Sequence, residues 1–256
     1  MIDFHSQLLN DVGLESFKLK SSIETINAAI QTGFDKLVIT PTYIGGLNPN
    51  KSYAEKLQLL ERLNLICTEK NINLTLHFGQ EIVFSHDIIT LLNDSKIATI
   101  NNTKYVLITF NQLHNSFYSV LNNIFDIQVA GYRPILCHPE RYQFVINNPS
   151  IVKDLIRRDI IIQLDCLSIV GAYGDDVKTT AKALLKGEMV HLLGTDAKTP
   201  QDYENSAKAY KKIKKIVGEN KFNEITQTNS NTILQNETYY PNEPKEERKG
   251  FFGFLG

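Results

Sequence analysis

The sequence lacks tryptophan and has only three cysteines in 256 residues, and no apolar run is long enough to span a bilayer. Cys67, Cys137 and Cys166 are widely spaced in apolar segments and odd in number, so we expect buried free thiols rather than a disulfide framework. The N-terminus also lacks the basic stretch and apolar core of a signal peptide. We therefore expect a cytoplasmic protein without a membrane span.

The sequence also lacks a marked excess of positive or negative charge. The formal net charge is −1, which gives no general attraction to nucleic acid or to an anionic membrane. A lysine-rich segment at 203–217 has helical spacing, and we interpret its lysines as a solvated helix face. The hydrophobic content of 42% is ordinary for a globular protein, and the length allows one large core.

Apolar strand-like runs alternate with amphipathic helical stretches along the chain. The predicted strands are 1–5, 36–40, 73–82, 104–110, 133–138, 160–165 and 189–196. Seven near-continuous apolar strands separated by helices indicate an α/β fold, a parallel sheet covered by helices and closed into a single distorted (β/α)7 barrel over residues 1–236. Residues 237–256 differ in composition, and we expect a short flexible C-terminal tail with an aromatic end.

The tail ends in "FFGFLG", and its role has two readings. Its aromatic side chains would dock into an apolar groove on a neighbouring chain or on another protein, since leaving them in water is costly. Alternatively, the tail packs on its own domain. The first reading allows a homo-oligomer.

Polar residues follow the predicted strands at one end. Chemistry in a parallel β/α barrel sits at the carboxyl ends of the strands. His5 ends the first strand and Glu81 the third, whereas "CHPERY" supplies His138 and Arg141 after the fifth, and Asp196 follows the seventh. Two imidazoles and two carboxylates converging there suit a divalent ion such as Zn²⁺, Mn²⁺ or Fe²⁺. The other histidines lack such company and are expected to be structural or superficial.

Several of these stretches resemble a known family. "IDFHSQLL", "GQEI", "YVLITF", "GYRPILCHPERYQ", "IIQLDCLSIVGAYG" and "GTDAK" occur in the order and spacing of the PHP (polymerase and histidinol phosphatase) superfamily. The resemblance is strongest to its CpsB/CapC-type bacterial protein tyrosine phosphatases. It implies a distorted seven-stranded barrel, up to three divalent metals (Mn, Fe, Zn or Mg), and hydrolysis of phosphotyrosine on a bacterial tyrosine kinase that controls capsule or exopolysaccharide export.

The resemblance also assigns roles to single residues. His5, Glu81, His138 and Asp196 match family metal ligands, and Arg141 matches a phosphate-contacting position and is the expected catalytic clamp.

Other family ligand positions are replaced. Gln7 and Thr42 stand where the family has histidines, Thr109 where it has a carboxylate, and Lys198 where it has a histidine. The acidic pair after the first strand falls in "NDVGLES", with only Asp11 nearby.

These replacements predict at most one tightly bound metal. A neutral amide oxygen is a weak ligand, and fewer carboxylates attract fewer cations. Lys198 either neutralises Asp196 and helps bind an anion, or points to solvent.

The function stays open at this point. A divergent capsule phosphatase of reduced or no activity, a fully active phosphatase using one or two metals, and a non-catalytic pseudophosphatase that binds a partner all fit. The missing ligands favour the binding module.

Overall fold

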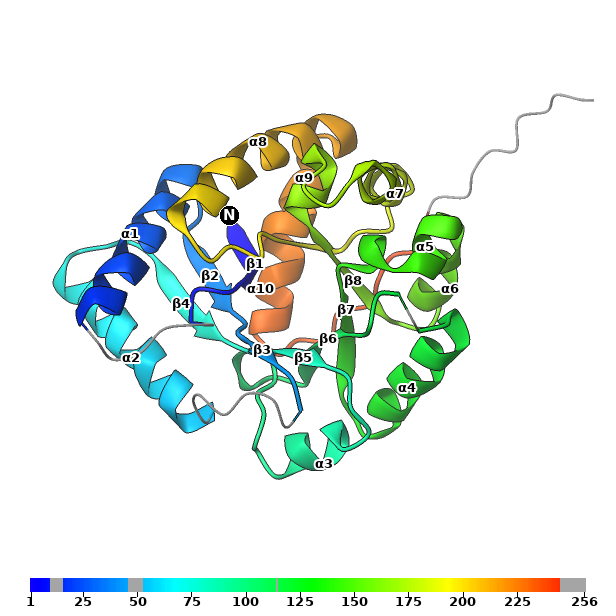
Figure 1. The fold of residues 1–256 in the computed structure, drawn as a ribbon, viewed down its shortest axis with the longest axis horizontal. Helices are drawn as coiled ribbons and strands as arrows, with labels where there is room; N and C mark the ends of the chain where they lie inside the picture. The colour runs from blue at the N-terminus through cyan, green and yellow to red at the C-terminus, as the bar shows by residue number, and fades with distance from the viewer. Residues whose placement is uncertain (10–15, 46–52, 114, 245–256) are drawn as a thin grey trace, which may run out of the picture.

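The structure, a computed structural model, describes residues 1–9, 16–45, 53–113 and 115–244. Helices surround a ring of strands, and the C-terminal helix α10 lies in the middle of Figure 1. The strands are β1 (Ile2–Ser6), β2 (Lys36–Ile39), β3 (Thr42–Tyr43), β4 (Thr75–Phe78), β5 (Glu81–Val83), β6 (Tyr105–Thr109), β7 (Arg133–Cys137), β8 (Ile161–Asp165) and β9 (Leu192–Gly194). The helices are α1 (Ser16–Thr32), α2 (Tyr53–Glu69), α3 (Ile88–Asn93), α4 (Phe117–Val129), α5 (Gln143–Asn147), α6 (Val152–Ile156), α7 (Asp175–Lys186), α8 (Pro200–Val217), α9 (Glu219–Asn223) and α10 (Asn229–Leu234).

All strand pairs are parallel, as predicted. One sheet has the order β1-β2-β4 and the other β3-β5-β6-β7-β8-β9. The two edges β9 and β1 meet through a parallel bridge between Ser6 and Ala197, and the Gln7 amide donates to the Ala197 carbonyl at 2.9 Å. The α/β class and the barrel-like arrangement of parallel strands are therefore confirmed.

One of the seven predicted strands, 73–82, is broken, and the predicted strand at 36–40 is followed by an additional short strand, β3. The described residues form nine strands, because β2 and β3 occupy one position in the ring and β4 and β5 another. Pro41, which has no amide hydrogen, separates the first pair, and Gly79 and Gln80 separate the second. A Cβ at Gly79 would collide with Ile100, so the backbone there lies against that side chain. The breaks are adjacent, since Ile39 pairs with Phe78 before them and Thr42 with Glu81 after them.

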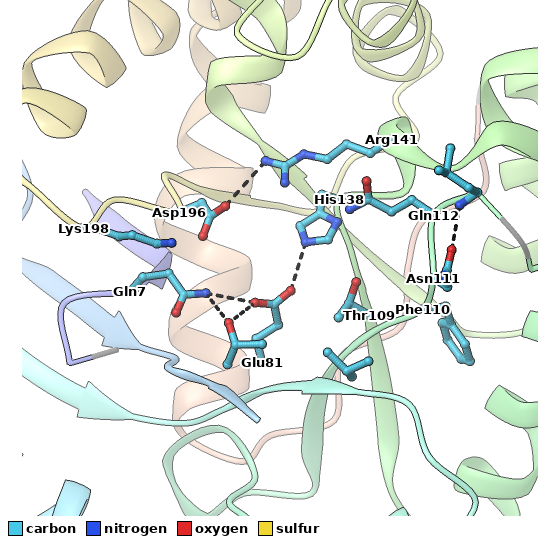
Figure 2. A pocket seen from close by; sticks show the side chains of 13 residues that line it. Gln7, Glu81, Thr109, Phe110, Asn111, Gln112, His138, Arg141, Asp196 and Lys198 are labelled. Atoms are coloured by element: carbon cyan, nitrogen blue, oxygen red, sulfur yellow. Dashed lines mark hydrogen bonds and ion pairs between the residues drawn. The ribbon is translucent and has the colours of Figure 1, made fainter. Parts of the chain in front are cut away.

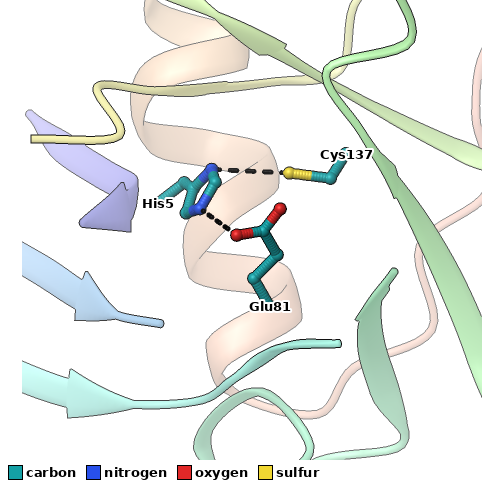
Figure 3. A group of neighbouring side chains, drawn as sticks. All are labelled: His5, Glu81 and Cys137. Atoms are coloured by element: carbon teal, nitrogen blue, oxygen red, sulfur yellow. Dashed lines mark hydrogen bonds and ion pairs between the residues drawn. The ribbon is translucent and has the colours of Figure 1, made fainter. Parts of the chain in front are cut away.

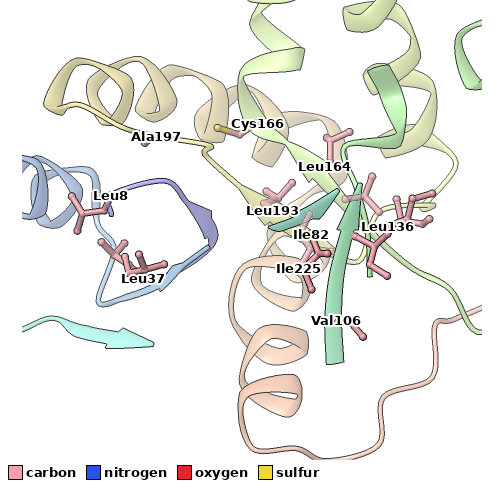
Figure 4. Packing of buried hydrophobic residues seen from close by; sticks show 14 of the residues in the cluster. Leu8, Leu37, Ile82, Val106, Leu136, Leu164, Cys166, Leu193, Ala197 and Ile225 are labelled. Carbon is pink, nitrogen blue, oxygen red and sulfur yellow. The ribbon is translucent and has the colours of Figure 1, made fainter. Parts of the chain in front are cut away.

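Two apolar layers hold the ring together. Inside it, Phe4, Leu107, Ile135 and Leu192 form a buried cluster that also includes Ile233 of α10. Outside it, strand side chains facing the other way pack under the helices, as Figure 4 shows for Leu136 and Leu164 among others. The period-two alternation of the strands supplies both layers.

Local sequence signals account for α2 and α8: an apolar repeat in the first helix and a capping motif at the start of the second. Leu59, Leu63 and Cys67 of α2 recur at four-residue spacing and are buried. At the start of α8, the Thr199 side chain accepts a hydrogen bond from the Asp202 amide, and the Asp202 side chain accepts one from the Thr199 amide. Pro200 occupies the first helical position. This cap anchors the loop that leaves β9.

The start of the expected tail lies against the barrel. The Tyr239 amide donates to the Tyr105 hydroxyl at 2.8 Å, and that hydroxyl donates to the Glu237 carbonyl at 2.6 Å. Arg133 donates to the Tyr239 carbonyl at 2.6 Å. The aromatic end falls in 245–256, outside the described residues, so its docking stays a prediction.

Within the part of the chain that the structure describes, no helix combines the length and apolarity needed to cross a bilayer.

Candidate metal and anion site

The carboxyl ends of the strands surround a cavity of about 490 Å³. Figure 2 shows five side chains pointing into it: Gln7 from just after β1, Glu81 from β5, His138 and Arg141 from the turn after β7, and Asp196 from the loop after β9. The structure thus brings together side chains that are far apart in the sequence, at the end where barrel enzymes carry their sites. Thr42, Thr109 and Lys198 also line this cavity.

Glu81 is the centre of what we call the Glu81 cluster, formed with His5, Gln7, Thr42 and His138. Its Oε1 lies 3.1 Å from His138 Nε2, and its Oε2 lies 3.5 Å from His5 Nε2. Oε2 also accepts hydrogen bonds from Gln7 Nε2 at 2.9 Å and from Thr42 Oγ1 at 2.8 Å. One carboxylate therefore presents an oxygen to each of two imidazoles.

Arg141 is the centre of a second group, the Arg141 cluster, formed with Asp165 and Tyr173. Its guanidinium is paired with the buried Asp165 carboxylate and lies 3.7 Å from the Tyr173 ring centroid. The Tyr173 hydroxyl donates to Asp165 at 2.8 Å. Asp196 connects the two clusters, with Oδ2 at 3.7 Å from Arg141 and Oδ1 at 3.8 Å from His5 Nε2.

Local backbone features aim these side chains. Asp3 and Ser6 pair with Leu37 and Ile39, so β1 carries one extra residue there. A bulge of this kind re-aims a side chain, here His5. His138 and Asp196 adopt φ of 37° and 54°, in the left-handed region that non-glycine residues rarely occupy. Such strain collects at functional sites.

Electrostatics in the Glu81 cluster favour protonated imidazoles. Burial opposes charge on His138, but the neighbouring Cys137 sulfur and the Glu81 carboxylate raise its pKa to about 10. The same contacts, against burial, hold the pKa of His5 well above its ordinary value. Burial alone would raise the pKa of Glu81, yet the hydrogen bonds from His138 and His5 keep it well below its usual range. Protons on the imidazoles balance the carboxylate in this cluster.

Electrostatics in the Arg141 cluster differ. Burial raises the pKa of Asp165, although the Arg141 charge opposes this. Burial would lower the pKa of Arg141, but Asp165 and Glu140 raise it further, so the guanidinium stays charged at any pH of interest.

The donor set fits a divalent cation at one position. Ligand atoms around a metal lie about 2.0–2.2 Å from it and therefore roughly 3–3.6 Å from one another. Nε2 of His5 lies 3.5 Å from Glu81 Oε2 and 3.8 Å from Asp196 Oδ1, close to that spacing. Gln7 Oε1 is buried without a hydrogen-bond partner. A half-turn of this amide would present that oxygen to the same place.

A second position is poorer. Glu81 Oε1 and His138 Nε2 face each other at 3.1 Å and are its two donors among the family-matched residues. Thr109 contributes a hydroxyl that lies 3.3 Å from the Tyr142 hydroxyl, where the resemblance expects a carboxylate.

Lys198 lies exposed at the rim of the cavity. Its backbone amide donates to Asp202 at 3.0 Å as part of the α8 cap. Within the described chain, the ion-pair partners of Asp196 are His5 and Arg141. The solvent-facing reading of Lys198 fits this arrangement, and an anion-binding role stays a prediction. The segment "NDVGLE" at 10–15 lies outside the described residues.

Sequence reasoning missed three contributors to the site. Asp165 and Tyr173 hold Arg141, and Cys137 lies 3.4 Å from the far nitrogen of His5. Asp165 ends a strand at the same edge as the predicted ligands, so its position was a usable signal. Tyr173 sits eight residues later, after a 3-10 turn at Cys166–Val170, and no spacing rule points to it. Cys137 lies among apolar residues in the sequence, so it is predicted to be a small buried hydrophobic residue and not part of the site.

Comparison with known proteins identifies the family. A family model described as "Capsular polysaccharide synthesis, CpsB/CapC" matches residues 1–235. The chain belongs to the CpsB/CapC family. The resemblance noted in the sequence is thereby confirmed. The roles that the family resemblance assigns to single residues remain predictions for this chain.

Named relatives cover nearly the full chain. This chain is 28% identical to the tyrosine-protein phosphatase YwqE of Bacillus subtilis, over the full length of both proteins. It is 27% identical to the tyrosine-protein phosphatase CpsB of Streptococcus pneumoniae, over 86% of this chain and 96% of that one.

Solved structures agree with this assignment. A crystal structure from work on YwqE and CpsB, described as unique metal-dependent tyrosine phosphatases, matches with a TM-score of 0.84 at 26% identity, covering 97% of this chain and 100% of that one. A histidinol phosphate phosphatase of Lactococcus lactis, complexed with zinc, L-histidinol and phosphate, shares the fold at a TM-score of 0.51 and 13% identity, covering 83% of this chain and 93% of that one.

Proposed function

We propose that this protein is a phosphatase that removes phosphate from tyrosine in a bacterial tyrosine kinase or polysaccharide export protein, using one divalent metal. The observation that carries the proposal is the convergence of His5, Glu81 and Asp196 beside Arg141 in one cavity. Relatives that match 86% and 100% of the chain are named as tyrosine phosphatases, which supports the substrate class.

The metal position is formed by Nε2 of His5, Oε2 of Glu81 and Oδ1 of Asp196, with the Gln7 amide beside them. When bound there, the metal supplies a Lewis acid and lowers the pKa of a water molecule. His138 holds the second oxygen of Glu81 at 3.1 Å, so it fixes the orientation of that carboxylate. Two cations would stabilise attacking and leaving oxygens better than one, and we therefore propose reduced turnover relative to a complete cluster.

Arg141 binds the phosphate group. Its guanidinium is held by Asp165 from one side and by the Tyr173 ring from another, while its Nε is buried without a hydrogen-bond partner. Charge-assisted bonds from a fixed guanidinium to phosphate oxygens are strong and directional. Val83, Phe110 and Leu113 line the same cavity and offer an apolar wall to the ring of the substrate. Lys198 at the rim adds a second positive charge near the anion.

A binding module without turnover is the second candidate. It is favoured by the fact that both oxygens of Glu81 already have partners, His138 on one side and Gln7 and Thr42 on the other. In that reading Arg141 captures a phosphorylated partner and releases it unchanged.

Phosphate release from a phosphotyrosyl peptide, with Mn²⁺ or Zn²⁺ added, tests the choice. The enzyme reading predicts a rate that falls by more than about 100-fold in Glu81→Gln, because Glu81 is a metal ligand and loss of a group that only supports a ligand already costs about 10–100-fold. Asp94→Asn, at an exposed ion pair with Lys96, serves as the control and should leave the rate unchanged. A background rate that is the same in both variants and in the unaltered protein, with peptide binding retained, would favour the binding module.

A further inference from the structure

Cys137 lies beside His5 and contacts the ring nitrogen that does not face Glu81 Oε2. Its Sγ is 3.4 Å from His5 Nδ1, whereas Glu81 Oε2 faces the other ring nitrogen, Nε2, at 3.5 Å. Figure 3 shows the thiol and the carboxylate each joined to a different ring nitrogen of His5. All three side chains are buried. An imidazole that binds a metal through one nitrogen needs a partner that sets the proton on the other.

Gln163 fixes which way the hydrogen bonds run. Its Oε1 accepts from the Cys137 thiol at 2.9 Å and from the His138 amide at 3.3 Å. Its Nε2 donates to the Leu164 carbonyl at 2.9 Å. Turning this amide over would place its NH2 group against the His138 amide and its oxygen against the Leu164 carbonyl, so both of those hydrogen bonds would be lost. Because the single thiol hydrogen goes to Gln163, the sulfur can only accept from His5.

We propose that Cys137, oriented by Gln163, is a positioning residue that keeps the proton of His5 on Nδ1 and so leaves Nε2 free to bind the metal. This role rests on His5 being a metal ligand in the proposed function. It gives the thiol the part that a carboxylate or a carbonyl plays behind many metal-bound histidines.

The packing around the three side chains is built for this contact. Cys137 and Gln163 are register partners on the neighbouring strands β7 and β8. Gly194 of β9 has no room for a side chain, because a Cβ there would collide with both His5 and Gln163. His5, Cys137 and Gln163 are each 0% exposed, so water cannot replace the thiol as the partner of Nδ1.

A thiolate ligand is the competing role for Cys137. His5, Glu81 and Cys137 each offer a donor atom within 4.8 Å of the others. The remaining metal-type donors, Glu81 and Asp196, lie on the Nε2 side of the ring. Because the contact of Sγ is with Nδ1 and not with the metal-facing Nε2, the positioning role is the one that the geometry favours.

Zinc affinity measured by calorimetry on the full chain tests the role first. Cys137→Val removes the acceptor at similar size, and zinc binding should weaken by about 10–100-fold. Cys137→Ser keeps a hydroxyl that can donate to Gln163 and accept from His5, so its affinity should lie between the two. Cys67→Val, a buried thiol of α2, is the matched control and should bind zinc as tightly as the unaltered protein. Equal affinity in Cys137→Val would overturn the proposal.

Spectroscopy on the loaded protein separates positioning from ligation and from general loosening. In zinc-loaded protein with ¹⁵N-labelled histidine, the His5 ring should carry its proton on Nδ1, and that signal should shift in Cys137→Ser but not in Cys67→Val. A proton absent from Nδ1 would contradict the proposal. Cobalt(II)-loaded protein should show no sulfur-to-metal charge-transfer band, and a strong band would make Cys137 a ligand instead. Unaltered protein that binds no zinc would overturn the proposed function itself.

Discussion

The Glu81 cluster and the Arg141 cluster, both at the mouth of the barrel, compensate their buried charges in different ways. In the Glu81 cluster the carboxylate is balanced by protons on His5 and His138, whose pKa values are raised. In the Arg141 cluster the balancing charge is a guanidinium that does not titrate, held by Asp165 and stacked on Tyr173. The first cluster can exchange its protons for a cation, whereas the second is complete as it stands.

The difference separates two abilities of the site. In the proposed function, recognition of a phosphate group depends on the Arg141 cluster, whose guanidinium is held by Asp165 and Tyr173. The proposed turnover depends on the Glu81 cluster, which would gain an electrophile when a cation takes the place of the imidazole protons. Loss of ligands in one cluster therefore does not imply loss of binding in the other.

The sharpest way to break this separation is Arg141→Lys. An ammonium cannot make the paired, planar contacts of a guanidinium, so KM for a phosphotyrosyl peptide should rise by about 10–100-fold. Bound metal, measured by elemental analysis, should stay as in the unaltered protein. A variant that loses its metal while keeping its KM would show that the two clusters are not separable.

The next test uses pH on protein stripped with chelator. The folded pKa of His138 is about 10, above the ordinary value of 6.5, so its contribution to stability is complete below pH 6.5 and is lost as the pH rises toward 10. The loss should reach about 1.4 kcal/mol per pH unit within that window. Denaturant midpoints between pH 6 and 10 measure it.

His138→Gln is the matching variant for that experiment, because its side chain does not titrate. Its stability should be flatter over the same pH range. Arg141→Lys should retain the slope of the unaltered protein, since that cluster does not release protons. A slope that persists undiminished in His138→Gln would place the titration elsewhere.

The smallest effect is expected at Lys198, outside both clusters. The side chain is exposed, so Lys198→Ala should change the free energy of unfolding by less than about 1 kcal/mol. Its charge at the rim should still matter for the substrate, with a rise in KM of a few-fold that added salt reduces. Destabilisation of several kcal/mol would instead mean that the ammonium compensates Asp196 inside the cavity.

Much of the fold and of the site could be predicted because parallel strands obey simple rules. His5, Glu81, His138 and Asp196 follow apolar runs, and such positions meet at one edge of a barrel. The break between β4 and β5 could not be found from "NLTLHFGQEI", since nothing local shows that Ile100 packs against Gly79.

The contacts that support the site residues could not be predicted from the sequence. Cys137 faces His5 because a bulge in β1 turns the imidazole inward and Gly194 allows the approach. Tyr173 reaches Arg141 from a separate turn. Both contacts depend on how distant segments pack, which residue spacing does not encode.

Calorimetric titration of chelator-stripped protein with Zn²⁺ or Mn²⁺ tests the central claim most directly, because it counts the cations that the Glu81 cluster can hold. One tight site per chain is predicted, formed by His5, Glu81 and Asp196, with peptide hydrolysis that reaches its plateau at one equivalent. Two or more tight sites, or hydrolysis that continues to rise with a second equivalent, would contradict it.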